Sequence, residues 1–97
     1  MKENIVLKPN KALEYVKLNV SKEDILELSY NRIFAPGEVL DVMVEEEFGE
    51  EEIIVSLHLN GNLINDIVKI NLNNIKEDLL EIVHITEEKE TIILIEE

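Results

Sequence analysis

Apolar and polar residues alternate along much of this chain, with the period of two that is typical of strands buried on one face. Residues 12–20 follow this alternation and are predicted to form a strand. Residues 25–30 fit both an alternating strand and a helical turn, and we expect a short strand or a single turn there. Residues 35–38, Ala-Pro-Gly-Glu, have the composition of a turn, and they lead into another alternating strand over residues 39–44.

A hairpin is predicted around Asn60-Gly61. These two residue types readily adopt the positive φ angles of a type I′ turn, whose twist matches that of paired strands. Residues 53–59 and 62–72 should therefore pair, with Leu57 opposite Ile64.

A short helix is predicted after this hairpin. Asn74-Ile75-Lys76-Glu77 has the spacing of a capping box, with Asn74 as the N-cap. The helix would run from Ile75 to about residue 81, and the alternative is a strand that begins at Leu79.

A second hairpin is predicted at the end of the sequence. Residues 82–86 and 91–95 flank a polar loop of four residues, which would place Ile85 opposite Ile92. The last strand contains the apolar run Ile92-Ile93-Leu94-Ile95, which a well-paired strand buried on both faces would explain. Alternatively, this strand or its neighbour completes a sheet across a subunit boundary, as in a structural subunit of a homo-oligomer or larger assembly.

These elements predict the class of fold. The chain has 97 residues, of which 45% are apolar, and this length favours one domain. It has no cysteine, which excludes a disulfide scaffold and a thiolate metal site. We expect one mainly β domain over residues 1–97, a small β-sandwich or partly open barrel of about six or seven strands with one or two short helices.

The charge narrows the choice of partners. The chain has nine Lys and Arg and 22 Asp and Glu, so its net charge is −13. Residues 1–32 contribute +1 to this charge and residues 33–97 contribute −14. This balance disfavours nucleic acid and anionic membranes and favours a protein with a basic surface. The N-terminal residues include no apolar run of signal-peptide or membrane-spanning length. Cytoplasmic residence is therefore expected, with a virion interior or an unusual secretion route left open.

The densest charge surrounds Phe48 and Gly49, and its six carboxylates belong to Glu45, Glu46, Glu47, Glu50, Glu51 and Glu52. As a binding site, this run would be a docking knob for a basic partner, with Phe48 as its apolar anchor. As ordinary structure, it would be a solvated hairpin loop turned by Gly49. Phe48 could then belong to the core, since it shares the parity of the apolar residues before it. The order of the acidic residues does not match an EF-hand loop, so no metal ligand is predicted.

Candidate catalytic residues are scarce. His58 and His84 are the only histidines, and they are interpreted as ordinary surface residues on strands. No metal-ligand spacing, nucleophile elbow or glycine-rich phosphate loop is present, so no catalytic, cofactor-binding or metal residues are predicted. The protein is therefore expected to be a non-enzymatic, acidic protein-binding module of the adaptor, inhibitor or immunity type.

Overall fold

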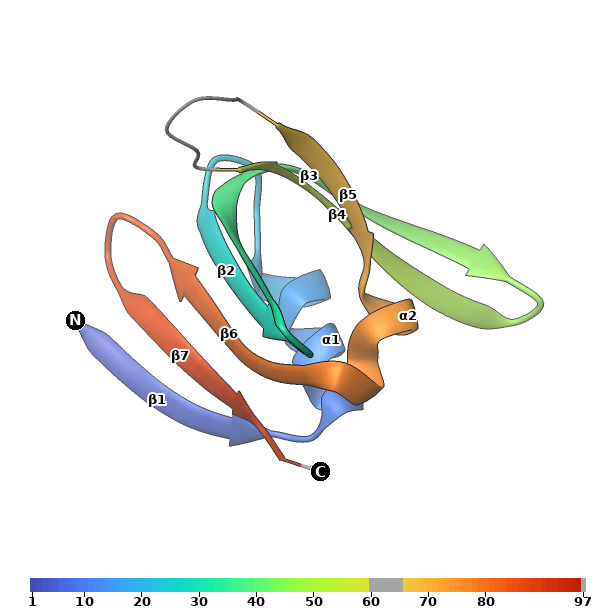
Figure 1. Ribbon diagram of the computed structural model, residues 1–97, viewed down its shortest axis with the longest axis horizontal. Coiled ribbons are helices and arrows are strands. Elements are labelled where there is room, and N and C mark those ends of the chain that lie inside the picture. The colour runs from blue at the N-terminus through green and yellow to red at the C-terminus, as the bar shows by residue number, and fades with distance from the viewer. Residues whose placement is uncertain (60–65, 97) are drawn as a thin grey trace.

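The computed structural model describes residues 1–59 and 66–96 (Figure 1). Its elements follow one another in an order dominated by strands: β1 (Lys2–Leu7), α1 (Pro9–Asn19), β2 (Ile25–Tyr30), β3 (Ile33–Glu47), β4 (Glu50–Leu59), β5 (Ile67–Asn71), α2 (Leu72–Ile75), the 3-10 turn η1 (Lys76–Asp78), β6 (Leu79–Ile85) and β7 (Glu90–Ile95).

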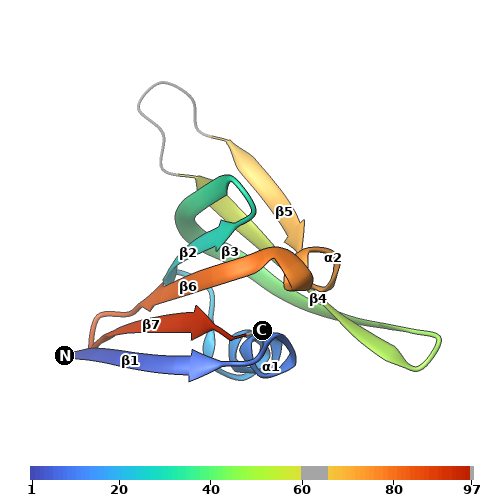
Figure 2. The same cartoon turned by 60° about the horizontal axis from the view of Figure 1, so that its bottom comes forward.

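The seven strands found in the described residues belong to one open sheet, in the order β1-β7-β6-β2-β3-β4-β5. Neighbouring strands are antiparallel except for β1 and β7, which are parallel. The predicted mainly β domain with short helices is confirmed, and it is an open sheet and not a pair of stacked sheets. The sheet twists strongly, so that β4 and β5 run steeply across the direction of β1 and β7 (Figure 2).

The hydrophobic core lies between the sheet and α1, which is behind the sheet in Figure 1. Ala12 and Val16 on the helix are fully buried. They belong to one cluster with apolar side chains from six strands, β2 to β7, among them Leu28, Leu57 and Ile93, each 0% exposed. Burial of these side chains on one face of the sheet is the main stabilising contribution that the fold offers.

The predicted strand at residues 12–20 is wrong, because Pro9–Asn19 is a helix. Ala12, Val16 and Val20 are four residues apart, a spacing that fits both a strand face and a helix face. Leu13 and Leu18 distinguish the two. Leu13 is buried, as a helical stripe requires, whereas Leu18 is 68% exposed. Pro9 at the first helical positions was the sequence signal for the helix start.

The predicted turn at residues 35–38 is also wrong, since it lies inside β3. Gly37 is required there by close strand packing. A Cβ atom at this position would lie 2.6 Å from the backbone oxygen of His58 on β4. The predicted strands at residues 25–30 and 39–44 are confirmed as β2 and part of β3.

Both predicted hairpins form, but with different registers. Leu57 pairs with Val68 and not with Ile64, a shift of four residues, and the proposed Asn60-Gly61 turn lies outside the described residues. Ile85 pairs with Glu90, two residues from its expected partner Ile92. Because side chains alternate with a period of two, these even shifts leave each side chain on its expected face.

The alternative prediction of a strand that begins at Leu79 is confirmed, because β6 starts at that residue. The helix is only the short turn Leu72–Ile75, and it is capped by Asn71 and not by Asn74. The Asn71 side chain accepts a hydrogen bond from the Asn73 N–H at 2.9 Å. Capping by Asn71 starts the turn three residues early, so α2 ends at Ile75, where the predicted helix was to begin, and only the 3-10 turn η1 lies within the rest of the predicted segment.

Candidate functional site

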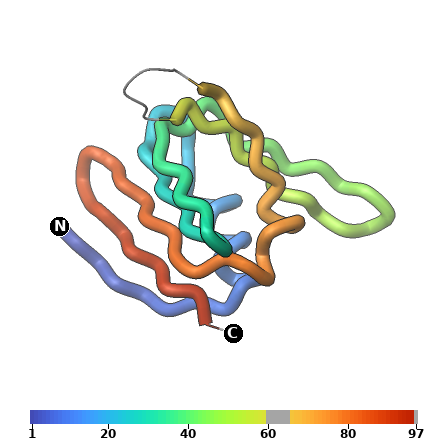
Figure 3. The backbone as a smooth tube through the Cα atoms, viewed as in Figure 1, coloured from blue at the N-terminus to red at the C-terminus, as the bar shows by residue number. Residues whose placement is uncertain are grey.

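The run of glutamates forms the end of a long β3–β4 hairpin that projects beyond the rest of the sheet (Figures 1 and 3). We call residues 45–52 the acidic arm. Three pairs of glutamates face each other across its two strands: Glu45 with Glu52, Glu46 with Glu51 and Glu47 with Glu50. Like charges placed directly opposite on a sheet are destabilising, so the arm keeps this arrangement at a cost in stability.

The tip of the acidic arm is a two-residue turn made by Phe48 and Gly49. Their φ angles are 53° and 81°, both positive as a type I′ turn requires. Phe48 is 97% exposed, so the alternative that placed it in the core is wrong. The reason is the length of the hairpin, which carries Phe48 past the helix that covers the core. An aromatic ring thus stands at the end of an acidic ribbon.

Two of the six carboxylates have polar partners among the described residues. Lys17 on α1 donates to Glu51 at 2.7 Å, and Asn71 on β5 donates to Glu52 at 3.2 Å. The other four carboxylates have no ion pair or hydrogen bond within the described part of the chain. Their charge is therefore available to a partner.

The two edges of the acidic arm differ. Beyond the end of β5, the side chain of Asn73 occupies the outer edge of β4. Its Oδ1 accepts the Ile53 N–H at 2.8 Å, and its Nδ2 donates to the Glu51 carbonyl at 2.9 Å. On the opposite side, β2 pairs with β3 only as far as Glu38. Two backbone hydrogen bonds extend that contact by one residue: the Glu23 N–H donates to the Val39 carbonyl, and the Val39 N–H donates to the Asp24 carbonyl.

His84 is not the surface residue that the sequence suggested, because it is only 3% exposed. Tyr15 Oη lies 2.8 Å from its Nδ1, and Asp24 Oδ2 lies 2.8 Å from its Nε2. In the tautomer with the ring proton on Nε2, Nε2–H donates to the carboxylate and Nδ1 accepts from the tyrosine hydroxyl. These bonds connect α1, the segment before β2, and β6. The alternation pattern gave the strand of His84 but carried no signal that its partners converge.

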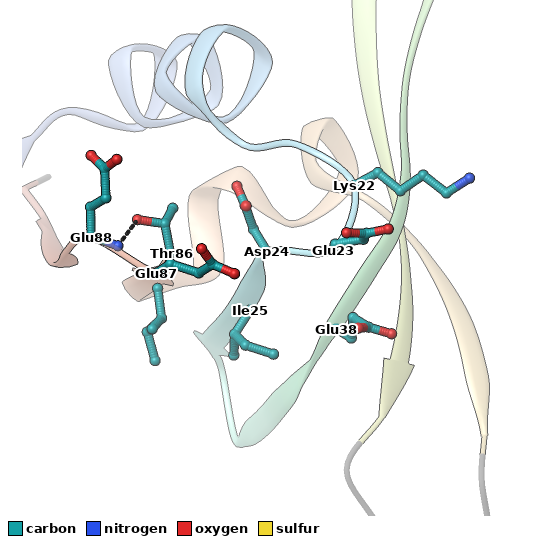
Figure 4. A pocket seen from close by; sticks show the side chains of 9 residues that line it. Lys22, Glu23, Asp24, Ile25, Glu38, Thr86, Glu87 and Glu88 are labelled. Carbon is teal, nitrogen blue, oxygen red and sulfur yellow. Dashed lines mark hydrogen bonds between the residues drawn. The ribbon is translucent and has the colours of Figure 1, made fainter.

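A shallow depression of about 750 Å³ lies beside this network (Figure 4). Figure 4 shows the Lys22 side chain extended away from the other labelled residues. The apolar part of the lining is Ile25 and Ile85. The remaining lining residues are polar and mostly acidic: Glu23, Asp24, Glu38, Thr86, Glu87 and Glu88. Among the residues that the structure describes, no group of three or more side chains is arranged to hold a metal ion.

His58 and the apolar run Ile92–Ile95 both lie on strands of the sheet, outside the acidic arm. His58 is partly buried on β4, opposite Glu38 and Ile67, and β2 and β3 lie between its strand and the strand of His84. The Ile92–Ile95 run lies in β7, between β1 and β6. It therefore has no free edge, and the neighbouring strand β1 holds the outer position.

The comparisons with known proteins give a family. A family model described as "Uncharacterized protein conserved in archaea (DUF2097)" matches residues 3–94. The chain belongs to this family. No curated protein and no solved structure matches this DUF2097 member. Within residues 1–59 and 66–96, no helix has the length and apolar character needed to cross a membrane.

Proposed function

We propose that this DUF2097 member is a non-enzymatic protein-binding domain that uses its acidic arm to recognise a protein with a basic surface. The observation that carries the proposal is Phe48, 97% exposed at the end of a ribbon with three Glu–Glu pairs. A chain selected for stability alone would not place like charges opposite each other three times. Cations from a partner would remove that repulsion on binding.

The arrangement suits recognition in two stages. The negative field of the arm would steer a basic partner into an encounter complex and raise the association rate. An exposed aromatic ring is the kind of side chain that supplies much of the binding energy once water is excluded from an interface. Phe48 would then set the lifetime of the complex, and the glutamates would set its rate of formation.

A binding role also agrees with the state of the one buried histidine. His84 uses both ring nitrogens within the fold and is 3% exposed, so it offers no free nitrogen to a substrate. The shallow depression beside it is lined mainly by carboxylates. We propose on the same charge grounds that the partner is neither nucleic acid nor a membrane. Residence in the cytoplasm stays a prediction.

Charge reversal tests the proposal. Glu46, Glu47, Glu50 and Glu51 are changed together to lysine, and the protein is used as bait in extracts of the native cell. Basic proteins retained by wild type are then measured for association rate at several salt concentrations. The variant should associate at least about tenfold more slowly, with a flatter salt dependence.

A matched control changes the same amount of charge elsewhere, at Glu77, Asp78, Glu87 and Glu88, all of which are exposed. Both variants have the same net charge, so a general field effect would slow them equally. Equal rates for the two variants would refute the arm as the binding site.

The second candidate is a structural subunit joined through sheet edges. It is favoured by the outer position of β1, which pairs only with β7 on the described sheet. Such an assembly would use β1 and not the Ile92–Ile95 strand itself. Light scattering distinguishes the two candidates, since a monomer at micromolar concentration contradicts assembly.

A further inference from the structure

The outer edge of the last part of β3, from Val42 into the acidic arm, carries backbone groups that no described residue satisfies. β3 runs to Glu47, whereas its partner β2 stops opposite Glu38. On the last part of β3, only β4 is hydrogen-bonded, on one side. An unpaired strand edge of this kind is a template for another strand.

The groups that point outward can be identified from the ladder. In an antiparallel pair, opposite residues alternately exchange both hydrogen bonds and exchange none. The Ile53 N–H and the Glu51 carbonyl are bound by Asn73, so they point away from β3. Their partners Val44 and Glu46 therefore direct their own N–H and C=O groups to the open side of β3.

The same alternation assigns Val42 to the open side, since it lies two residues before Val44 and pairs with Val55. The Glu47–Glu50 pair next to the turn then exchanges hydrogen bonds, as a two-residue hairpin requires. The open edge thus presents donors and acceptors at Val42, Val44 and Glu46. Asn73 closes the corresponding edge of β4, so only one side of the arm is a template.

The glutamates beside the open edge of β3 favour a positively charged strand as its binding partner. Glu46 and Glu51 lie on one face of the ribbon, and the other four glutamates, Glu45, Glu47, Glu50 and Glu52, lie on the other, because side chains alternate. An added strand would have every second side chain on the same face as Glu45 and Glu47, so cations at these alternate positions would meet the face with more carboxylates. A second copy of this chain, with a net charge of −13, would be repelled.

We propose that the open edge of β3, at residues 42–46, binds an extended segment of a partner protein as an added strand, and that this segment carries lysine or arginine at alternate positions. The inference rests on the proposed function and specifies the form of the partner. Backbone hydrogen bonds supply alignment, and alternate cations pair with the glutamates. Each such pair replaces repulsion within the arm by attraction across the added strand.

The test uses a synthetic peptide of nine residues that alternates lysine and threonine, capped at both ends. Strand addition should protect the amide protons of Val44 and Glu46 from hydrogen exchange, followed by nuclear magnetic resonance. Attraction by charge alone would leave these two protons as exposed as in the free protein. Lack of protection at saturating peptide would overturn the proposal, as would no binding up to about 1 mM.

A pair of variants separates the backbone from the charge. Glu46→Pro removes the outward N–H and the carboxylate, whereas Glu46→Gln removes only the charge. Proline is tolerated where a strand N–H faces solvent, so both variants should unfold at nearly the same temperature. Glu46→Pro should bind the peptide about tenfold more weakly than Glu46→Gln.

Equal affinities of these two variants would overturn strand addition and leave the proposed function standing. If instead the acidic arm is not a binding site at all, the four-residue charge reversal fails against its control. The two hypotheses can therefore fail separately.

Discussion

His84 joins three parts of the chain through two hydrogen bonds of 2.8 Å, to Tyr15 and to Asp24. Its ring also meets the Tyr15 ring edge-on, with centroids 5.6 Å apart. A buried polar side chain with both partners in place rigidifies its surroundings, and its removal leaves those partners unsatisfied. The structural role of this residue therefore exceeds what a lone histidine on a strand suggests.

Replacement of His84 by alanine tests this role. His84→Ala leaves a cavity, removes the partner of the Tyr15 hydroxyl and leaves the Asp24 carboxylate with only its hydrogen bond from the Ser21 N–H, so the free energy of unfolding should fall by about 3 kcal/mol. Urea unfolding followed by circular dichroism measures the change. His58→Ala is the control, because that ring is more exposed, and it should cost no more than about 1 kcal/mol. A similar loss in both variants would contradict a special role for the His84 network.

At the scale of elements, α1 and β3 show where local patterns mislead. The apolar spacing of α1 satisfied two periodicities at once, and Leu13 was the position that only a helix explains. Pro36-Gly37 looked like a turn but lies within a strand, where the glycine allows β4 to approach. In both cases the residue types fit two local structures, and packing against a neighbouring element decided which of the two forms.

The close contact between β3 and β4 at Gly37 should make this position intolerant of a larger side chain. Gly37→Ala would place Cβ 2.6 Å from the His58 backbone oxygen, and neither strand can yield without losing ladder hydrogen bonds. The free energy of unfolding should fall by about 1–3 kcal/mol, measured by urea unfolding. Gly49→Ala is the comparison, since nothing lies within 4 Å of its Cβ and only its φ of 81° is strained. Its cost should be confined to the arm, as faster amide exchange there. No loss of stability in Gly37→Ala would refute the close approach.

For the whole molecule, charge is the dominant feature outside the core. A net charge of −13 is carried by a body of 39 × 27 × 26 Å. At an ionic strength of 0.01 M the Debye length is about 30 Å, so the carboxylates repel one another across the molecule. At 0.1 M it is about 10 Å, and repulsion is limited to near neighbours such as the pairs in the arm.

The unfolding temperature should therefore rise by a few degrees, roughly 3–8 °C, when sodium chloride increases from 0.01 to 0.3 M. Differential scanning calorimetry measures this rise. The variant with lysine at Glu46, Glu47, Glu50 and Glu51 is the control. Each change adds two charges, which brings the net charge from −13 to −5, so its salt dependence should be smaller. An unfolding temperature of wild type that is independent of salt would contradict repulsion as a significant destabilising force.

Local patterns in the chain were enough to predict the mainly β class, the face on which most strand residues lie, and the hairpin around Gly49. These properties depend on side-chain alternation and turn chemistry, which act within a few residues. Three properties depend on the folded arrangement of the whole chain: the registers of β4–β5 and β6–β7, the burial of His84, and the open edge of β3. Each depends on which distant segment lies alongside, and the alternation is equally satisfied by registers that differ by two residues. The carboxylates of the acidic arm could thus be found in the sequence, whereas the unpaired backbone edge of β3 beside them could not.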